Sequence, residues 1–190
     1  IMVGSLVIFL IGVLDDIIGV SAKVKLLFQI LAALIVCGFG LRIEFITNHF
    51  ALRLGDDHLF LIGVISWVVT VIWIVGITNT MNLIDGLDGL AAGISFIASL
   101  AIAYTAYIHG YYLGTLGLLC LGGGALGFLP YNFHPARIFM GDSGSLFLGF
   151  MLSTMAMVEP AKGATVVAIM VPVLVLGLPI FDTAFAIARR

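Results

Sequence analysis

Residues 60–78 read FLIGVISWVVTVIWIVGIT, and NTMNLIDGLDGL (79–90) follows them directly. The first stretch has 19 residues and no charge, and an apolar run of roughly 17–25 residues can cross a bilayer as an α-helix. The second stretch carries four polar side chains at three-residue intervals: Asn79, Asn82, Asp85 and Asp88. Because ionisable groups at membrane depth are costly and usually functional, the two stretches predict a membrane helix that ends in a polar site.

The composition of the whole chain agrees with a membrane protein. The 190 residues are 62% hydrophobic and 9% charged, with a mean hydropathy of +1.26, which excludes an ordinary soluble domain. Six more stretches are expected to span: 1–14, 26–41, 90–108, 111–129, 144–158 and 164–187. We therefore predict an all-α integral membrane fold, a polytopic helical bundle of about seven spans. Cys37 and Cys120 lie inside apolar runs, which favours buried thiols.

The segments outside the spans carry less information. Residues 42–59 alternate in part and contain a Gly-Asp break, which favours a small extramembrane loop with a β-hairpin. We treat 1–190 as a single membrane domain. Because the chain begins inside an apolar run and ends at Arg190 without a turn, we interpret it as an internal part of a longer protein.

Alternating spans place the loops on two sides of the membrane. One side receives five basic residues and the other three: Lys23, Lys25, Arg137, Arg189 and Arg190 against Arg42, Arg53 and Lys162. Basic residues are enriched in cytoplasmic loops. We therefore expect a multi-pass protein of the inner (plasma) membrane with its polar site on the cytoplasmic face.

Carboxylates gather on that cytoplasmic side: Asp15, Asp16, Asp85, Asp88 and Asp142. They repel one another unless a cation offsets their charge, and Mg²⁺ prefers one or two carboxylates with waters and substrate phosphates. Lys25 is expected on the same face. Carboxylates, a hard metal ion and a lysine are the groups that phosphoryl transfer needs. No nucleic-acid partner is expected.

Each motif alone also has a structural explanation. Asp15 and Asp16 could form a polar helix end, Asn79 and Asn82 could pair helices, and GDSGS (141–145) could be an N-cap with a glycine turn. Only their joint occurrence on one face favours a site. Asp15 and Asp16 would point about 100° apart on a helix, so we expect different roles for them.

The four polar residues of 79–90 cannot all share one helix face. Asn79 and Asp88 would point in opposite directions on an ideal helix. Gly86 and Gly89 are therefore expected to end the helix in a loop that lets the four side chains converge.

Several motifs occur together and in order: DD (15–16) with GVSAKVKLLFQ (19–29), RIEFITN (42–48), NTMNLIDGLDGLAAG (79–93), YNFHPARIFMGDSGSLFLG (131–149) and PIFDTAFAIARR (179–190). On these motifs the chain resembles the polyprenyl-phosphate N-acetylhexosamine-1-phosphate transferases. The resemblance is closer to the bacterial undecaprenyl-phosphate GlcNAc-1-phosphate transferase branch, which starts teichoic acid and lipopolysaccharide synthesis, than to the related phospho-MurNAc-pentapeptide translocases.

The resemblance implies a reaction at the membrane surface. An N-acetylamino-sugar 1-phosphate, GlcNAc-1-phosphate first, would pass from a UDP-sugar to undecaprenyl phosphate, with release of UMP. Mg²⁺ is implied as the cofactor, with Mn²⁺ as a substitute, and a homodimer would fit the family. The family also has spans before this chain and a histidine-rich loop after its Arg-Arg ending.

The resemblance assigns roles by motif. Asp142, with Asn82 second, is implied as a metal ligand. The catalytic group is implied to be Asp15, Asp16, Lys25 and Asp88. The substrate-binding residues are implied to be Asn79, Asn82, Asp85, Arg137, Phe139 and Gly141, with Phe139 stacking on uracil. His134 is expected to support the site.

Two other functions are weaker. A CDP-alcohol phosphotransferase needs an alanine-arginine pair after its first Asp-Gly, whereas Asp85-Gly86 is followed by LDGL (87–90). A cation channel or transporter predicts carboxylates near mid-bilayer on broken helices, and only Asp182 is partly placed in that way.

Overall fold

The computed structural model describes residues 1–43 and 59–158. Its helices, in chain order, are α1 (Met2–Ile18), α2 (Ala22–Gly38), α4 (Leu59–Ile84), α5 (Leu90–Ile108), α6 (Tyr112–Asn132) and α7 (Gly141–Met155). Within these two ranges the expectation of an all-helical fold is confirmed. The predicted last span, 164–187, lies outside the described residues, and so does the predicted β-hairpin in 42–59, apart from positions 42, 43 and 59.

Three of the described helices are long and apolar enough to cross a membrane: Gly63–Ile84, Leu90–Ile108 and Tyr112–Asn132. The helices α1 and α2 have 17 residues each and α7 has 15. The described part is therefore that of a membrane helical protein, and the count of seven spans stays a prediction.

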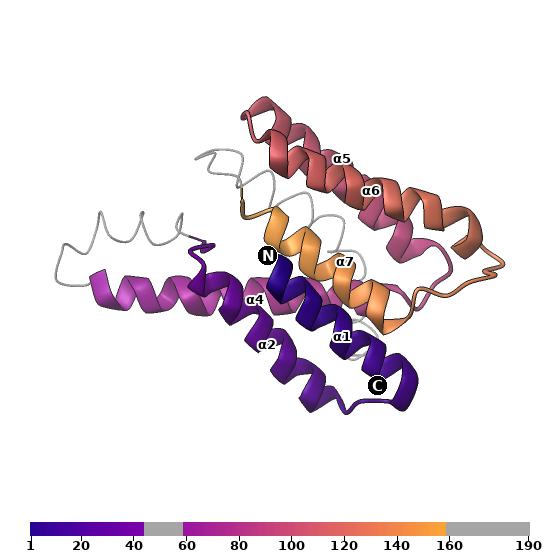
Figure 1. Ribbon diagram of the computed structural model, residues 1–190, viewed down its shortest axis with the longest axis horizontal. Helices are drawn as coiled ribbons and strands as arrows, with labels where there is room; N and C mark the ends of the chain where they lie inside the picture. The colour runs from indigo at the N-terminus through magenta and orange to yellow at the C-terminus, as the bar shows by residue number, and fades with distance from the viewer. Residues whose placement is uncertain (44–58, 159–190) are drawn as a thin grey trace, which may run out of the picture.

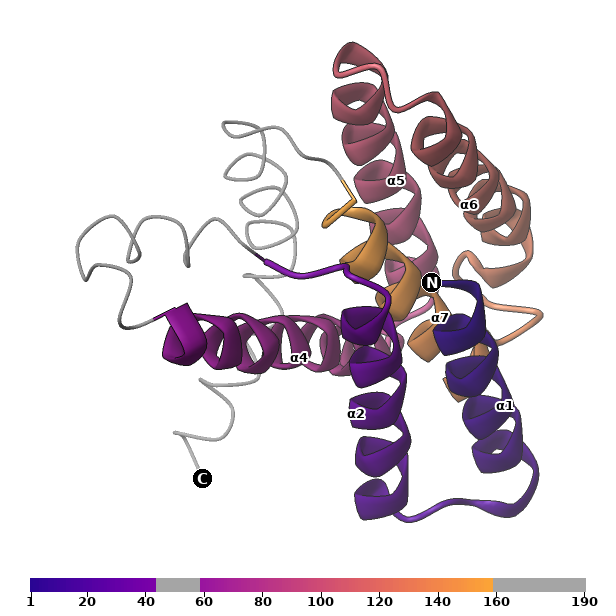
Figure 2. The same ribbon diagram turned by 60° about the vertical axis from the view of Figure 1, so that its left-hand side comes forward.

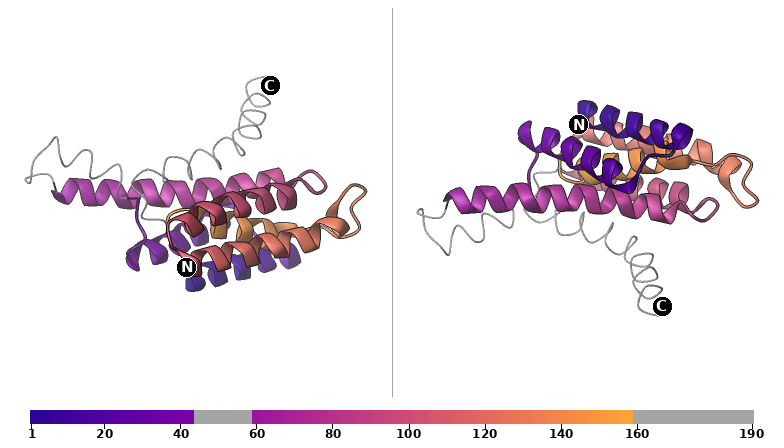
Figure 3. Two further views of the ribbon diagram at one scale, coloured as in Figure 1. Left: turned by 90° about the horizontal axis from the view of Figure 1, so that it is seen from above. Right: turned by 90° about the horizontal axis from the view of Figure 1, so that it is seen from below.

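Helix α7 lies at the centre of the arrangement. It packs between α1 and α4, while α2 packs against both α1 and α4. Helices α5 and α6 form an antiparallel hairpin that contacts α7 less extensively (Figures 1 and 2). The views from above and below show α4 running along one side of the other helices (Figure 3).

Small residues allow α7 to approach its neighbours closely. At Gly12 of α1, an added Cβ would lie 2.5 Å from the Cα of Ser143. At Gly149 of α7, an added Cβ would lie 2.8 Å from the Cα of Thr78 on α4. Close approach at small residues is how helices associate in a bilayer, where apolar burial alone does not drive packing.

The expected first span, 1–14, is shorter than the observed helix, because α1 continues through Asp15 and Asp16 to Ile18. The expected loop at Gly86 and Gly89 is confirmed, because α4 ends at Ile84. Polar residues are costly in lipid, which favours a helix end before Asp15. A helix that reaches the membrane surface can nevertheless continue, because its backbone bonds remain satisfied within the helix. The loop between α1 and α2 is correspondingly short.

These extended helices meet at one end of the bundle. The last turns of α1, α4 and α6 and the first turns of α2, α5 and α7 lie together at this end (Figure 1). Chain segments far apart in the sequence thereby contribute side chains to one polar cluster.

Candidate functional site

Asp142 is the centre of the polar cluster. It lies in the first turn of α7, and its Oδ2 is 2.6 Å from the Nζ of Lys25 on α2. Its Oδ1 accepts a hydrogen bond of 3.0 Å from the Nδ2 of Asn82 on α4. One carboxylate thus joins three helices.

Asp15 is the second partner of Lys25. Its Oδ2 lies 2.8 Å from the ammonium nitrogen, and its Oδ1 accepts from the backbone N–H of Val20. The Asp15 side chain is 14% exposed and that of Lys25 is 22% exposed. The ammonium is therefore partly shielded from water between two carboxylates, which strengthens its electrostatic attraction to both.

Asp16 performs a different task from its neighbour. Its two oxygens accept hydrogen bonds from the backbone N–H groups of Asp142 (2.8 Å) and Ser143 (3.0 Å). An N-cap side chain accepts from these same second and third positions of a helix, and the residue at the N-cap of α7, Met140, makes no such bond. Asp16 thus caps α7 from another helix, whereas the resemblance implies a catalytic role.

Asp85 follows directly after α4 and is partly buried. Burial raises the pKa of its carboxyl to about 6, and the negative charges of Asp142 and Asp16 act in the same direction. The part of this rise that comes from Asp142 and Asp16 shows that negative charges lie close together at this end of the bundle.

Asn82 can contribute an oxygen to this cluster. Its Nδ2 donates to Asp142 and, at 3.0 Å, to the Oγ of Ser145. Because both amide hydrogens are used, the carbonyl oxygen is the atom left to face a ligand. In the part of the chain that the structure describes, no group of three or more His, Cys, Asp and Glu residues has the geometry of a metal site.

Asp88 lies apart from the Lys25 cluster. Its Oδ2 accepts from the backbone N–H of Ala136 (3.1 Å) and lies 3.0 Å from the Nδ1 of His134. The Ala136 bond and then the His134 bond hold the pKa of Asp88 below its usual value. Asp88 therefore ties the loop after α4 to the loop before α7, and His134 supports this tie.

Asn132 reinforces the same connection. Its Oδ1 accepts from the N–H of Gly89 (3.1 Å), and its Nδ2 donates to the carbonyl of Ile138 (3.0 Å). Asn132 is 2% exposed, so this side chain fixes the two loops from inside.

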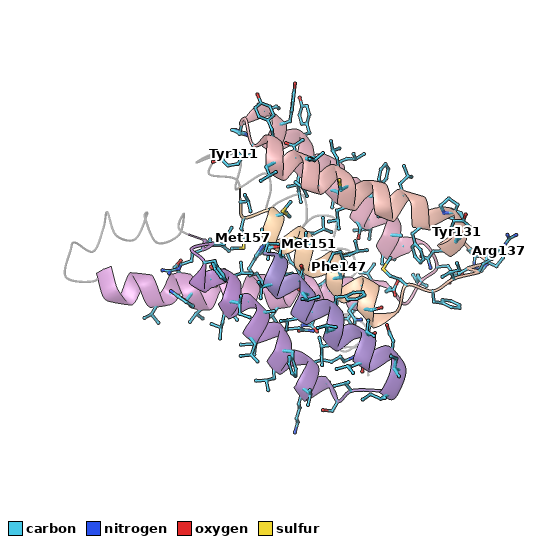
Figure 4. All side chains as sticks on the ribbon, viewed as in Figure 1. Tyr111, Tyr131, Arg137, Phe147, Met151 and Met157 are labelled. Carbon is cyan, nitrogen blue, oxygen red and sulfur yellow. The ribbon has the colours of Figure 1, made fainter. Side chains whose placement is uncertain are left out.

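Two predicted substrate-binding residues lie on the α6–α7 loop itself. Arg137 is exposed at the outer tip of that loop (Figure 4). Phe139 is 75% exposed and lines an apolar cavity of about 380 Å³ between α6 and α7. Phe147 lines the same cavity from α7, on the side that faces α6 (Figure 4).

The remaining predicted residues divide between two places. Gly141 lies against Asp16 with φ +69°, and an added Cβ there would be 2.8 Å from Asp16 Oδ2. Asn79 does not face Asp142, because its amide pairs with Gln29 on α2. The four polar residues of 79–90 thus point to three neighbourhoods instead of converging on one.

Sequence reasoning singled out neither Gln29, Ser145 nor Asn132. Each lies inside a quoted motif, but none carries a charge. A signal existed for Gln29, which is an amide in an otherwise apolar run four residues after Lys25. Intramembrane polar residues of this kind need a partner.

The sequence of the chain is similar to those of known proteins. The family described as Glycosyl transferase family 4 matches residues 1–159. A relative from Bacillus subtilis, "Probable undecaprenyl-phosphate N-acetylglucosaminyl 1-phosphate transferase", is 47% identical over 190 residues, which is 100% of this chain and 52% of the relative.

More distant relatives carry related names. "Decaprenyl-phosphate N-acetylglucosaminephosphotransferase" of Mycobacterium tuberculosis is 37% identical over 100% of this chain and 51% of its own length. "Phospho-N-acetylmuramoyl-pentapeptide-transferase" of Thermoanaerobacter is 36% identical over 82% of this chain and 51% of its own length. The chain spans about half the length of these curated relatives.

Proposed function

The chain belongs to glycosyl transferase family 4, and we propose on that premise that it takes part in transferring GlcNAc-1-phosphate from a UDP-sugar to undecaprenyl phosphate. The name of the Bacillus subtilis relative supports this substrate pair. The observation that carries the proposal is the Lys25 ammonium held between Asp15 and Asp142 at the ends of membrane helices. A nucleotide from water and an isoprenoid from lipid meet at such a boundary.

The reaction exchanges one phosphoanhydride bond for another. An oxygen of the lipid phosphate attacks the phosphorus that carries the sugar, and the bond from that phosphorus to the UMP oxygen breaks. UMP leaves, and undecaprenyl-diphospho-sugar stays in the bilayer. A lipid phosphate is largely dianionic near neutral pH, since its second pKa is about 6. The protein therefore has little need to remove a proton from the nucleophile.

Lys25 is suited to steadying the phosphate charge. An ammonium has three hydrogens, and two of them serve Asp15 and Asp142. The third can donate to a phosphate oxygen, and the two carboxylates hold the nitrogen in place while it does so. Preorganised donors of this kind lower the barrier because they need no rearrangement during the reaction.

Mg²⁺ fits the donors at this site. Asp142 and the Asn82 carbonyl oxygen would hold it, a small set of protein oxygens that leaves room for waters and substrate phosphates. The negative charges of Asp142 and Asp16, which add to burial in raising the pKa of Asp85, support a cation here. When bound, the ion would neutralise developing charge on the phosphates.

The loops beside the site are assigned to the nucleotide. Asp88 and Asn132 hold the α6–α7 loop that carries Phe139 through Ala136 and Ile138, and Phe139 offers an exposed aromatic face. We also propose that the protein has seven spans, that the site lies on the cytoplasmic face of the inner membrane, and that the protein forms a homodimer.

The test is UMP release by membranes that carry the complete protein. UDP-GlcNAc and Mg²⁺ are supplied with and without undecaprenyl phosphate, and Asp142→Asn serves as the matched variant. We expect release that needs the lipid, is lost in Asp142→Asn and stops when the divalent ion is chelated. Absence of release with every UDP-amino sugar, from folded protein, would overturn the proposal.

The transport alternative finds no support in the described ranges. The carboxylates there, Asp15, Asp16, Asp85, Asp88 and Asp142, gather at one end of the bundle. A cation pathway needs ionisable groups at mid-bilayer depth, and Asp182 lies outside the described residues. A transporter would also release no UMP.

A further inference from the structure

A reciprocal pair of amides joins α2 to α4 next to the candidate site. The Nδ2 of Asn79 donates to the Oε1 of Gln29 (2.5 Å), and the Nε2 of Gln29 donates to the Oδ1 of Asn79 (3.3 Å). The second hydrogen of Asn79 Nδ2 is given to the carbonyl of Val75 (2.8 Å). Gln29 is 2% exposed. The pair is therefore a buried polar contact within a membrane helix bundle.

The pair lies one helical turn from the residues that bind Asp142. Gln29 follows Lys25 by four positions on α2, and Asn79 precedes Asn82 by three positions on α4. Residues three or four apart lie on the same helix face. The faces that bring Lys25 and Asn82 to Asp142 are thus the faces that the amide pair joins.

We propose that Gln29 and Asn79 are positioning residues, which fix the register of α2 against α4 so that Lys25 and Asn82 both reach Asp142. This inference concerns how the site is built, and its kinetic test rests on the proposed transferase function. It assigns Asn79 to the scaffold and not to the substrate.

The reason for a polar pair is specificity. Apolar side chains in a bilayer gain little from meeting one another instead of lipid, so an apolar interface between two helices specifies its register weakly. A single buried polar contact is satisfied in one register only, as polar residues in coiled-coil interfaces show. A shift of α2 by one turn would leave both amides unpaired and would carry Lys25 away from Asp142.

The contacts of Asn79 also argue against a direct substrate role. Both of its amide hydrogens and its carbonyl oxygen are already engaged. A substrate contact would require breaking the bond to a buried partner. Asn82 differs in this respect, because its carbonyl oxygen is left over.

The test uses five variants of the complete protein in membranes: Gln29→Leu, Asn79→Leu, the double leucine, the exchange Gln29→Asn with Asn79→Gln, and Thr80→Val as control. Thr80 is next to Asn79, but its hydroxyl bonds only the carbonyl of Gly76 in its own helix. Melting temperature is measured for all five, together with kcat and KM for lipid-dependent UMP release.

Each single leucine variant leaves one buried amide unpaired, so we expect a lower melting temperature and a kcat reduced on the order of 10- to 100-fold. The double leucine variant should recover most of the melting temperature, because two leucines can pack together without an unpaired amide. It should not recover the kcat, because an apolar contact does not fix the register of α2 against α4. The exchange should restore both, because it keeps the two amides and their combined length. Thr80→Val should match the wild type.

If the wild type releases UMP, two results would overturn the inference. One is a double leucine variant that is stable and as fast as the wild type. The other is an exchange variant that recovers stability but stays inactive, which would give Asn79 a substrate contact. If the wild type itself releases no UMP, the proposed function fails instead. The inference about helix register is then tested by melting temperature alone. It is refuted if the double leucine variant loses as much melting temperature as the two single variants lose together.

Discussion

Replacing Asp16 by alanine tests whether this residue caps helix α7 or takes part in catalysis. Asp16 accepts from the N–H groups of Asp142 and Ser143 at 2.8 and 3.0 Å, and it makes these bonds across the contact between α1 and α7. In Asp16→Ala both N–H groups lose their partner. The first turn of α7, which carries Asp142, is then expected to loosen.

The magnitude follows from the two bonds and the charge. Loss of a capping side chain costs about 0.5–2 kcal/mol, and loss of a negative charge at a helix N-terminus costs about 0.3–1 kcal/mol more. Because Asp16 is exposed, we expect a total of about 1–2 kcal/mol. For a chain of this size, each kcal/mol lowers the melting temperature by about 2–4 °C.

The assay compares Asp16→Ala, Asp16→Asn and Ser143→Ala for melting temperature and UMP release. Asp16→Asn keeps one acceptor oxygen, so its stability and rate should lie between those of Asp16→Ala and the wild type. Ser143→Ala keeps the backbone N–H and should change neither quantity. An Asp16→Asn protein with a wild-type melting temperature and no activity would refute the capping role and restore the catalytic one.

Three further changes test the site. Lys25→Met should lower kcat on the order of 10²–10³-fold, whereas Lys25→Arg should retain part of the rate. The pKa of Asp85 is raised from 3.8 to about 6. Without divalent ions, the contribution of Asp85 to stability is therefore full below about pH 4 and is lost as the pH rises through 6. The melting temperature of the wild type should fall over this pH range, and that of Asp85→Asn should not show this fall. Gly12→Val should lower the melting temperature and the rate of UMP release, because the added side chain would push α1 away from Ser143 on α7. Gly93→Ala should change neither, because nothing lies within 4 Å of an added Cβ at Gly93.

The membrane character of the chain could be predicted from its composition and from the length of its apolar stretches, because the thickness of the bilayer sets the length of a membrane span. The apolar stretches 90–108 and 111–129 correspond closely to α5 and α6. Helix ends were less predictable. At Asp16 the chain stays helical, and the sequence alone does not reveal that this side chain finds its partners on α7.

The polar cluster could be located from the sequence, but its internal assignments depended on contacts between distant segments. Asp15, Lys25, Asn82 and Asp142 come together as expected. Asn79 differs because its partner Gln29 lies on another helix, 50 positions away. The sequence analysis also allowed Asn79 and Asn82 to be a pair that joins helices. This interpretation holds for Asn79, whereas Asn82 faces the site. A spacing of three residues places two side chains on neighbouring parts of a helix face but does not say which helix each one meets.

The charges at the helix ends also constrain how the substrates can enter. Asp15, Asp16, Asp85 and Asp142 lie at the same end of the bundle as Lys25, whose charge is already shared by Asp15 and Asp142. Both proposed substrates carry phosphates, so a site of this composition would repel them on its own. A proton on Asp85 relieves part of that repulsion at low pH. Near neutral pH a bound cation would give the same relief, which is the role that the proposed Mg²⁺ would have at these carboxylates.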